Sequence, residues 1–85
     1  MARKRRSLER ILANPKGVRF SEMVVVIEAF GFHLSRVKGS HHIFAHPGIV
    51  ELVNLQDVNG EAKPYQIRQF LQLVERYDLE MEERS

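Results

Sequence analysis

The sequence predicts a single α+β domain of helix, three antiparallel strands and helix, with an extra short helix in front. A chain of 85 residues is long enough for one domain only. Apolar residues recur at helical spacing before residue 31 and after residue 64, and β-rich runs separated by turn residues lie between. Helices that flank consecutive strands typically pack on one face of an antiparallel sheet. We therefore expect the opposite face of the sheet to be open for binding.

Two helices are expected in the first 31 residues. Residues 6–13 predict a short helix that ends at Asn14, Pro15 and Gly17. A stronger helix follows, with Ser21 as a good N-cap residue and Gly31 as its terminator. Within this helix, Phe20 and Val25 have the spacing of a hydrophobic staple. The helix has a broad apolar stripe that contains Phe20, Met23, Val24, Val25, Ile27 and Phe30.

Three strands and a closing helix make up the rest. We predict strands over residues 32–37, 41–46 and 49–55, separated by the turns Lys38–Ser40 and Pro47-Gly48. A further turn over residues 57–60 leads to a helix that begins near Pro64, a residue favoured at the first helical position. The apolar face of this helix is formed by Ile67, Phe70, Leu71, Val74 and Tyr77.

Composition excludes several classes of protein. The chain has no cysteine, so its fold does not rest on disulfides. No apolar run approaches the roughly 20 residues of a membrane span. The start MARKRRSLER is basic, but no apolar signal-peptide core follows it, so we expect a cytoplasmic protein without membrane contact. A domain this small is marginally stable, so a partner protein is expected to help hold it together.

Charge is distributed unevenly along the chain. Residues 1–20 contain seven Lys and Arg residues against the single acid Glu9, whereas residues 61–85 contain four basic and six acidic residues. A basic arm attracts polyanions such as nucleic acid, and that attraction weakens with salt. The alternative is a solvated tail. The closing acidic stretch, Glu80–Glu83, is expected to be a solvated end.

Four histidines fall within fourteen residues: His33, His41, His42 and His46. A zinc site is disfavoured, because zinc ligands must converge to about 2.0–2.1 Å from the ion. On a strand, His41 and His42 point to opposite faces, and His42 and His46 lie roughly 13 Å apart at about 3.3 Å per residue. For His33 and His46 we expect hydrogen bonding to neighbours and no chemical role.

The segment around His41 favours catalysis or phosphate binding. His41 directly follows Gly39-Ser40, and a tight turn exposes backbone N–H groups that bind anions. Lys38 and Arg36 add positive charge beside the turn. RNA supplies its own nucleophile, the 2′-hydroxyl, and a histidine that titrates near neutrality can take its proton or protonate the leaving oxygen.

The register of the hairpin decides which histidine points outward. With Lys38–Ser40 as a three-residue loop, Leu34 pairs with Phe44 and Val37 with His41. Phe32, Leu34 and Phe44 then face the helices, and His41 faces outward with Ser35 and Ile43. A loop one residue shorter would turn His42 outward instead. Pairing of Leu34 with Phe44 in the core favours the first register.

The stretch FGFHLSRVKGSHHIFAHP, residues 30–47, resembles the HicA (YcfA-like) toxin family. It contains the family's Gly-Phe at the end of a helix, a short strand, Gly-Ser-His and then an aromatic residue. Lys63-Pro64-Tyr65 and the helix after it are similar to the family's closing segment. The resemblance covers roughly residues 20–78. It suggests a basic extension with a short helix over 1–19, a HicA-like domain over 20–79 and an acidic tail over 80–85.

This resemblance implies a double-stranded-RNA-binding-domain-like fold and the activity of a messenger-RNA interferase that works without a cofactor. It also implies a partner, a HicB-like antitoxin that covers the active site. The family's glycine falls on Gly39 and its catalytic histidine on His41, with His42 as a second catalytic candidate. Ser40, Lys38 and Arg36 are the expected RNA phosphate contacts.

Two departures from the family pattern keep a second reading open. Many members carry Pro-x-His on the third strand, where this chain reads Asn54-Leu55-Gln56, and the N-terminal extension is longer than usual. The alternative function is a non-catalytic RNA-binding module that uses the same basic hairpin. A third is a pure protein-interaction domain paired with an antitoxin.

Overall fold

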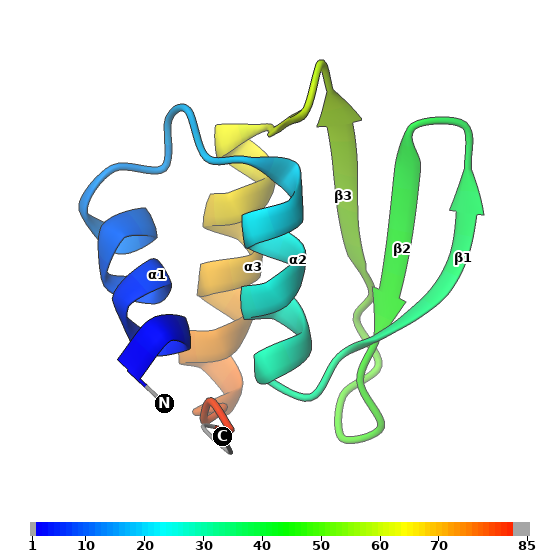
Figure 1. Cartoon of the computed structure of the whole chain (residues 1–85). Coiled ribbons are helices and arrows are strands. Elements are labelled where there is room, and N and C mark those ends of the chain that lie inside the picture. Colours follow the sequence, from blue (N-terminus) through cyan, green and yellow to red (C-terminus); the bar gives the residue numbers. More distant parts are fainter. Residues whose placement is uncertain (1, 83–85) are drawn as a thin grey trace.

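A computed structural model describes residues 2–82, and it has the predicted α+β architecture (Figure 1). Its elements are α1 (Ala2–Ala13), α2 (Phe20–Ala29), β1 (His33–Lys38), β2 (His41–Ala45), β3 (Val53–Val58), β4 (Glu61–Ala62) and α3 (Pro64–Tyr77). The strands form one antiparallel sheet in the order β1-β2-β3-β4. The predicted order α-β-β-β-α with an added N-terminal helix is confirmed, and it is consistent with a double-stranded-RNA-binding-domain-like fold.

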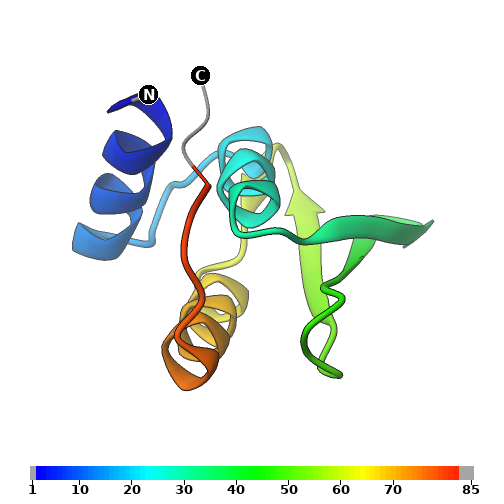
Figure 2. The same cartoon turned by 90° about the horizontal axis from the view of Figure 1, so that it is seen from below.

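Helices α2 and α3 pack against the inner face of the sheet, and the largest buried side chains lie between these layers (Figures 1 and 2). Phe30, Phe32 and Phe70 meet there with their rings edge to face, at centroid distances of 5.5–5.6 Å. Such pairs add to the stabilisation that apolar burial provides. No helix formed by residues 2–82 covers the other face of the sheet (Figure 2), so within this part of the chain that face is open.

Helix α2 differs in detail from the prediction. It begins at Phe20, with Arg19 as an N-cap that makes no side-chain hydrogen bond, so Ser21 lies within the first turn. Val25 is exposed, and Val26 is buried in its place. The reason is the helical period, because Met23, Val26, Ile27 and Phe30 lie on one side and Val25 projects toward α1.

The third strand begins later than predicted, at Val53, and a short fourth strand follows it. Residues 49–52 form a loop held against the end of α3, where the Glu51 carboxylate accepts hydrogen bonds from the Tyr77 hydroxyl at 2.6 Å and from Arg76 at 3.2 Å. The Tyr77 hydrogen bond is the largest cause that lowers the pKa of Glu51, and it raises the pKa of Tyr77. Asn59 and Gly60 both have positive φ, which suits the two-residue turn that pairs β3 with β4.

Helix α1 and the chain after α3 form an outer layer. Helix α1 begins at Ala2, earlier than the predicted residue 6, and packs on α2 through Ile11, which is fully buried. The segment after α3 runs back along the helices (Figure 2), where Leu79 and Met81 contact the core and the Glu82 N–H donates to the Ala29 carbonyl at 2.7 Å. The Glu80 and Glu82 side chains are exposed, as expected of a solvated end, but Met81 and the Glu82 N–H hold the backbone of this segment against the helices. Met1 and residues 83–85 lie outside the described residues.

None of the helices in residues 2–82 has the length and apolar character needed to cross a membrane.

Candidate active site

The hairpin of β1 and β2 turns through two residues, Gly39 and Ser40, with Lys38 opposite His41. Gly39 has a φ of 60°, in the left-handed region that glycine adopts without strain. The predicted pairing of Leu34 with Phe44 is present, but Val37 pairs with His42, so the predicted pairing of Val37 with His41 is wrong. The loop has two residues where three were predicted, and a bulge at Ser35 adds one residue to β1. The two differences cancel, so Leu34 still pairs with Phe44.

The buried side chain of Phe44 fixes which face each β2 residue occupies. Because side chains alternate along a strand, His42 shares the inner face with Phe44, and His41 shares the outer face with Ile43. The ring of His42 lies 4.7 Å from that of Phe20 at the start of α2, and its Nδ1 lies 3.4 Å from the Ser40 carbonyl oxygen. The two histidines proposed for catalysis therefore lie on opposite faces of the sheet.

Leu34 does not enter the core as predicted. Its side chain is on the inner face beside Phe44 but is 48% exposed, because β1 is the edge strand and reaches beyond the helices (Figure 2). The predicted burial of Phe32 and Phe44 is confirmed.

His41 lies among polar side chains from both neighbouring strands. Its Nδ1 is 3.2 Å from the Oδ1 of Asn54 on β3. The registers place Lys38 and Gln56 directly beside His41 on the same face, and Arg36 two residue pairs further along β1. Lys38 and Arg36 are exposed and His41 is half-buried, so an anion can approach all three from solvent.

A chain of hydrogen bonds ties the Gly39-Ser40 turn to α3. The Gln56 Nε2 donates to the Ser40 Oγ at 3.2 Å, and the Asp57 N–H donates to the Ser40 carbonyl at 2.9 Å. The Gln56 backbone N–H in turn donates to the Oε1 of Gln66 at 2.7 Å. Gln66 is the one buried polar side chain among the described residues, at 3% exposure. The turn before His41 is therefore anchored from two elements distant in sequence.

A comparison with protein families identifies the family of this chain. The model described as "HicA toxin of bacterial toxin-antitoxin" matches residues 20–75 of the 85. The chain belongs to the HicA toxin family. It is thus a toxin of a toxin–antitoxin system, and HicA membership implies a cognate antitoxin as partner. No curated protein and no solved structure matches the chain.

In this HicA toxin the structure brings together four of the six predicted site residues: Lys38, Gly39, Ser40 and His41 form the end of the hairpin, and Arg36 extends the same face. Only His42 faces away. Asn54 and Gln56 were not among the predicted site residues, although the structure places them beside His41. The sequence signal was that they lie where many HicA members carry Pro-x-His.

The remaining histidines lie outside this group. The Nδ1 of His46 accepts a hydrogen bond from the Gly48 N–H at 2.9 Å, and its ring stands edge-on to Phe32 at 5.0 Å. His33 is exposed at the start of β1. Within residues 2–82, no three His, Asp or Glu side chains gather as metal ligands would.

The arrangement has the parts needed for acid–base chemistry on a phosphodiester. An imidazole on an exposed sheet face can move a proton, and two neighbouring cations can attract and hold a phosphate. The turn beside them is held by hydrogen bonds through Ser40 and Gln56, which fixes the backbone from which Lys38 and His41 project.

Proposed function

We propose that this HicA toxin is an endoribonuclease, a messenger-RNA interferase that uses His41 as its acid–base catalyst and needs no metal ion. The observation that carries the proposal is the position of His41 on the open sheet face, beside Lys38 and two residue pairs from Arg36. Gly39 shapes the turn. Ser40, Lys38 and Arg36 are assigned to phosphate contact.

The reaction needs His41 to take up a proton and release it again, and it needs no external nucleophile. His41 takes the proton of a ribose 2′-hydroxyl, and the 2′ oxygen attacks the adjacent phosphorus. The bond from phosphorus to the 5′ oxygen breaks, and that oxygen takes a proton from water. The hydroxide left by that water takes the proton from His41, which returns to its neutral form. The products are a 2′,3′-cyclic phosphate and a 5′-hydroxyl end. Lys38 and Arg36 stabilise the negative charge that grows on the phosphoryl oxygens.

His42 is assigned no proton transfer in this proposal. Adjacent residues of a strand project to opposite faces, so a phosphate held beside His41 is on the wrong side of the sheet for His42. Its contact with Phe20 gives it a packing role beneath the turn.

We further propose that the antitoxin is HicB-like and neutralises the toxin by covering the face that carries His41. This face is open in the structure and lacks a helix that would restrict access (Figure 1).

The test is cleavage of a long single-stranded RNA in EDTA by the wild type and by His41→Ala, with folding of both checked by circular dichroism. We expect the variant to lose roughly 10²–10⁴-fold in rate, the contribution typical of a positioned acid–base group. His33→Ala is the matched control, because it removes an exposed histidine from the same hairpin, and it should keep the wild-type rate. Equal cleavage by the wild type and His41→Ala would overturn the assignment.

The second candidate is an RNA-binding module without catalysis. The replacement of Pro-x-His by Asn54-Leu55-Gln56 favours it, because this chain lacks the histidine that many HicA members carry on the third strand. RNA binding by a folded wild type that leaves the RNA uncut would support the binding module and reject the enzyme.

A further inference from the structure

On the open face of the sheet, the side chain of His41 contacts the side chain of Asn54. The two side chains come from adjacent strands, and the Nδ1 of His41 lies 3.2 Å from the Oδ1 of Asn54. Their residues are diagonal neighbours, since His41 pairs with Gln56 and Ile43 pairs with Asn54. This contact is distinct from the hydrogen bonds that hold the turn through Ser40.

The chemistry of the two atoms fixes the direction of the hydrogen bond. A carboxamide oxygen only accepts, so the Nδ1 of His41 must carry the proton. In a neutral imidazole, one nitrogen is the donor and the other is the acceptor. The lone pair available for a base is then on Nε2, the nitrogen that Asn54 does not contact.

We infer that Asn54 is a positioning residue that holds His41 in the Nδ1–H tautomer and thereby makes Nε2 the atom that takes the 2′-hydroxyl proton. The inference rests on the proposed function and deepens it by naming the reacting atom. The hydrogen-bond partner of one ring nitrogen commonly sets which nitrogen of a histidine reacts. Here a neutral amide sets the tautomer without adding charge to the site.

An uncharged partner suits this position for an electrostatic reason. The charged side chains beside His41 on this face are Lys38 and Arg36 from β1, and β3 contributes the neutral Asn54 and Gln56. A carboxylate in place of Asn54 would repel the RNA phosphate and would favour the protonated, inactive form of a base. An amide orients the ring without either effect.

The first test measures the tautomer in the free protein, without RNA. We expect ¹⁵N NMR of neutral His41 to show a protonated Nδ1 and an unprotonated Nε2 in the wild type. In Asn54→Ala, the population should shift toward the Nε2–H form that histidine prefers in water. An unprotonated Nδ1 in the wild type, or an unchanged tautomer in Asn54→Ala, would overturn the inference.

The second test measures single-turnover cleavage and its pH profile. Asn54→Ala should cut about tenfold or more slowly, within the roughly 10²–10⁴-fold that acid–base catalysis supplies, while RNA affinity stays within twofold. Asn54→Asp keeps the accepting oxygen and should restore the tautomer. Its negative charge favours the protonated imidazole, so its cleavage rate should fall relative to the wild type as the pH is lowered.

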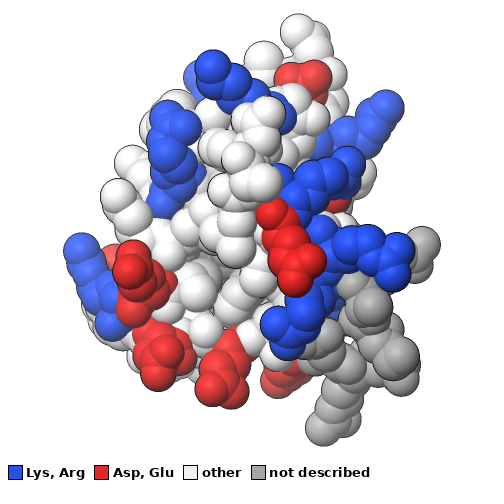
Figure 3. Space-filling view, turned by 90° about the vertical axis from the view of Figure 1, so that its left-hand side faces the viewer, with Lys and Arg blue, Asp and Glu red and all other residues white. Residues whose placement is uncertain are grey.

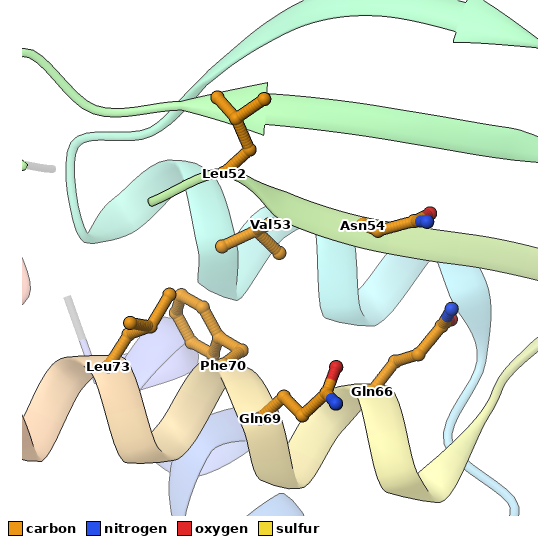
Figure 4. A pocket seen from close by; sticks show the side chains of 7 residues that line it. All are labelled: Leu52, Val53, Asn54, Gln66, Gln69, Phe70 and Leu73. Carbon is orange, nitrogen blue, oxygen red and sulfur yellow. The ribbon is translucent and has the colours of Figure 1, made fainter. Parts of the chain in front are cut away.

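Gln69→Ala is the matched control, because Gln69 is an exposed carboxamide of α3 that lines the same small pocket as Asn54 (Figure 4). It should leave both the tautomer and the rate unchanged. If neither the wild type nor any variant cleaves RNA, the proposed function is rejected. The tautomer measurement would still decide whether Asn54 orients His41. Wild-type cleavage with no effect of Asn54→Ala on rate or tautomer would reject the role of Asn54 alone.

Discussion

Gln66 is a buried side chain whose function is structural and local. Its Oε1 accepts the backbone N–H of Gln56, which points away from β2 at the edge of β3. Its Nε2 lies 3.4 Å from the Tyr65 hydroxyl. An unpaired N–H in this part-buried position would lose its hydrogen bond to water without gaining another. The Gln66 carboxamide therefore provides the acceptor for a backbone N–H that has no partner within the sheet. The same contact fixes α3 against the strand that carries Asn54.

Replacing Gln66 with methionine keeps the length of the side chain and removes its hydrogen-bonding atoms. We expect Gln66→Met to lower the free energy of unfolding by about 1–3 kcal/mol, the usual cost of leaving a buried polar group unpaired. Urea unfolding followed by circular dichroism measures this change. Gln69→Met, on the exposed neighbouring turn of α3, should stay within about 0.5 kcal/mol of the wild type. If Gln66→Met is as stable as the wild type, Gln66 does not anchor β3 to α3.

At the scale of elements, the hairpin shows what sequence patterns can and cannot predict. The pairing of Leu34 with Phe44 was predictable from two apolar residues flanking a turn, and with it the outward position of His41. The bulge at Ser35 was not predictable from the sequence. A loop shorter by one residue and a bulge of one residue cancel in the register, so the pattern of apolar residues is the same with both or with neither. Asn54 could not be placed beside His41 without the register between β2 and β3, which depends on contacts far apart in sequence.

Helix α1 lies outside the span matched to the HicA family and is nevertheless part of the core. Ile11 is fully buried, while the adjacent Leu12 is 57% exposed. An ion pair between Arg10 and Glu22 joins the outer surfaces of α1 and α2. Because the Arg10 end of this pair is exposed to water, which weakens the ionic attraction, most of the docking free energy comes from the apolar contact.

The pair Ile11 and Leu12 offers a direct test of this element. Ile11→Ala should destabilise the protein by about 2–5 kcal/mol, the range for deleting a buried aliphatic side chain. Leu12→Ala removes a similar apolar volume from an exposed position and should change stability by about 0.5 kcal/mol or less. Thermal and urea unfolding of the two variants compare these costs. Similar small effects of both would show that α1 is an appendage and no part of the cooperative fold.

At the scale of the whole molecule, the structure shows that the basic residues of α1 and those of the hairpin lie apart. Their number in the sequence does not reveal this separation. Helix α1 lies on the far side of the helical layer from the sheet (Figure 1), so its cations do not extend the surface around His41. Figure 3 shows Lys and Arg side chains over much of that far side, with several Asp and Glu side chains gathered along its lower edge. The expected attraction of RNA by the basic arm therefore has to be distinguished from attraction by the hairpin.

Two double variants with equal loss of charge make that distinction. Arg36→Gln with Lys38→Gln removes the two cations beside His41, and Arg6→Gln with Lys16→Gln removes two exposed cations from the N-terminal region. For single-stranded RNA, each lost phosphate contact makes the plot of log affinity against log salt concentration shallower by roughly 0.7. We expect the hairpin variant to lose about 1.4 of slope on this scale, and the N-terminal variant to keep the wild-type slope. Because both variants have the same net charge, a general electrostatic effect would change the two slopes equally. That outcome would contradict a binding face centred on His41, and fluorescence anisotropy with labelled RNA at several salt concentrations decides between the two.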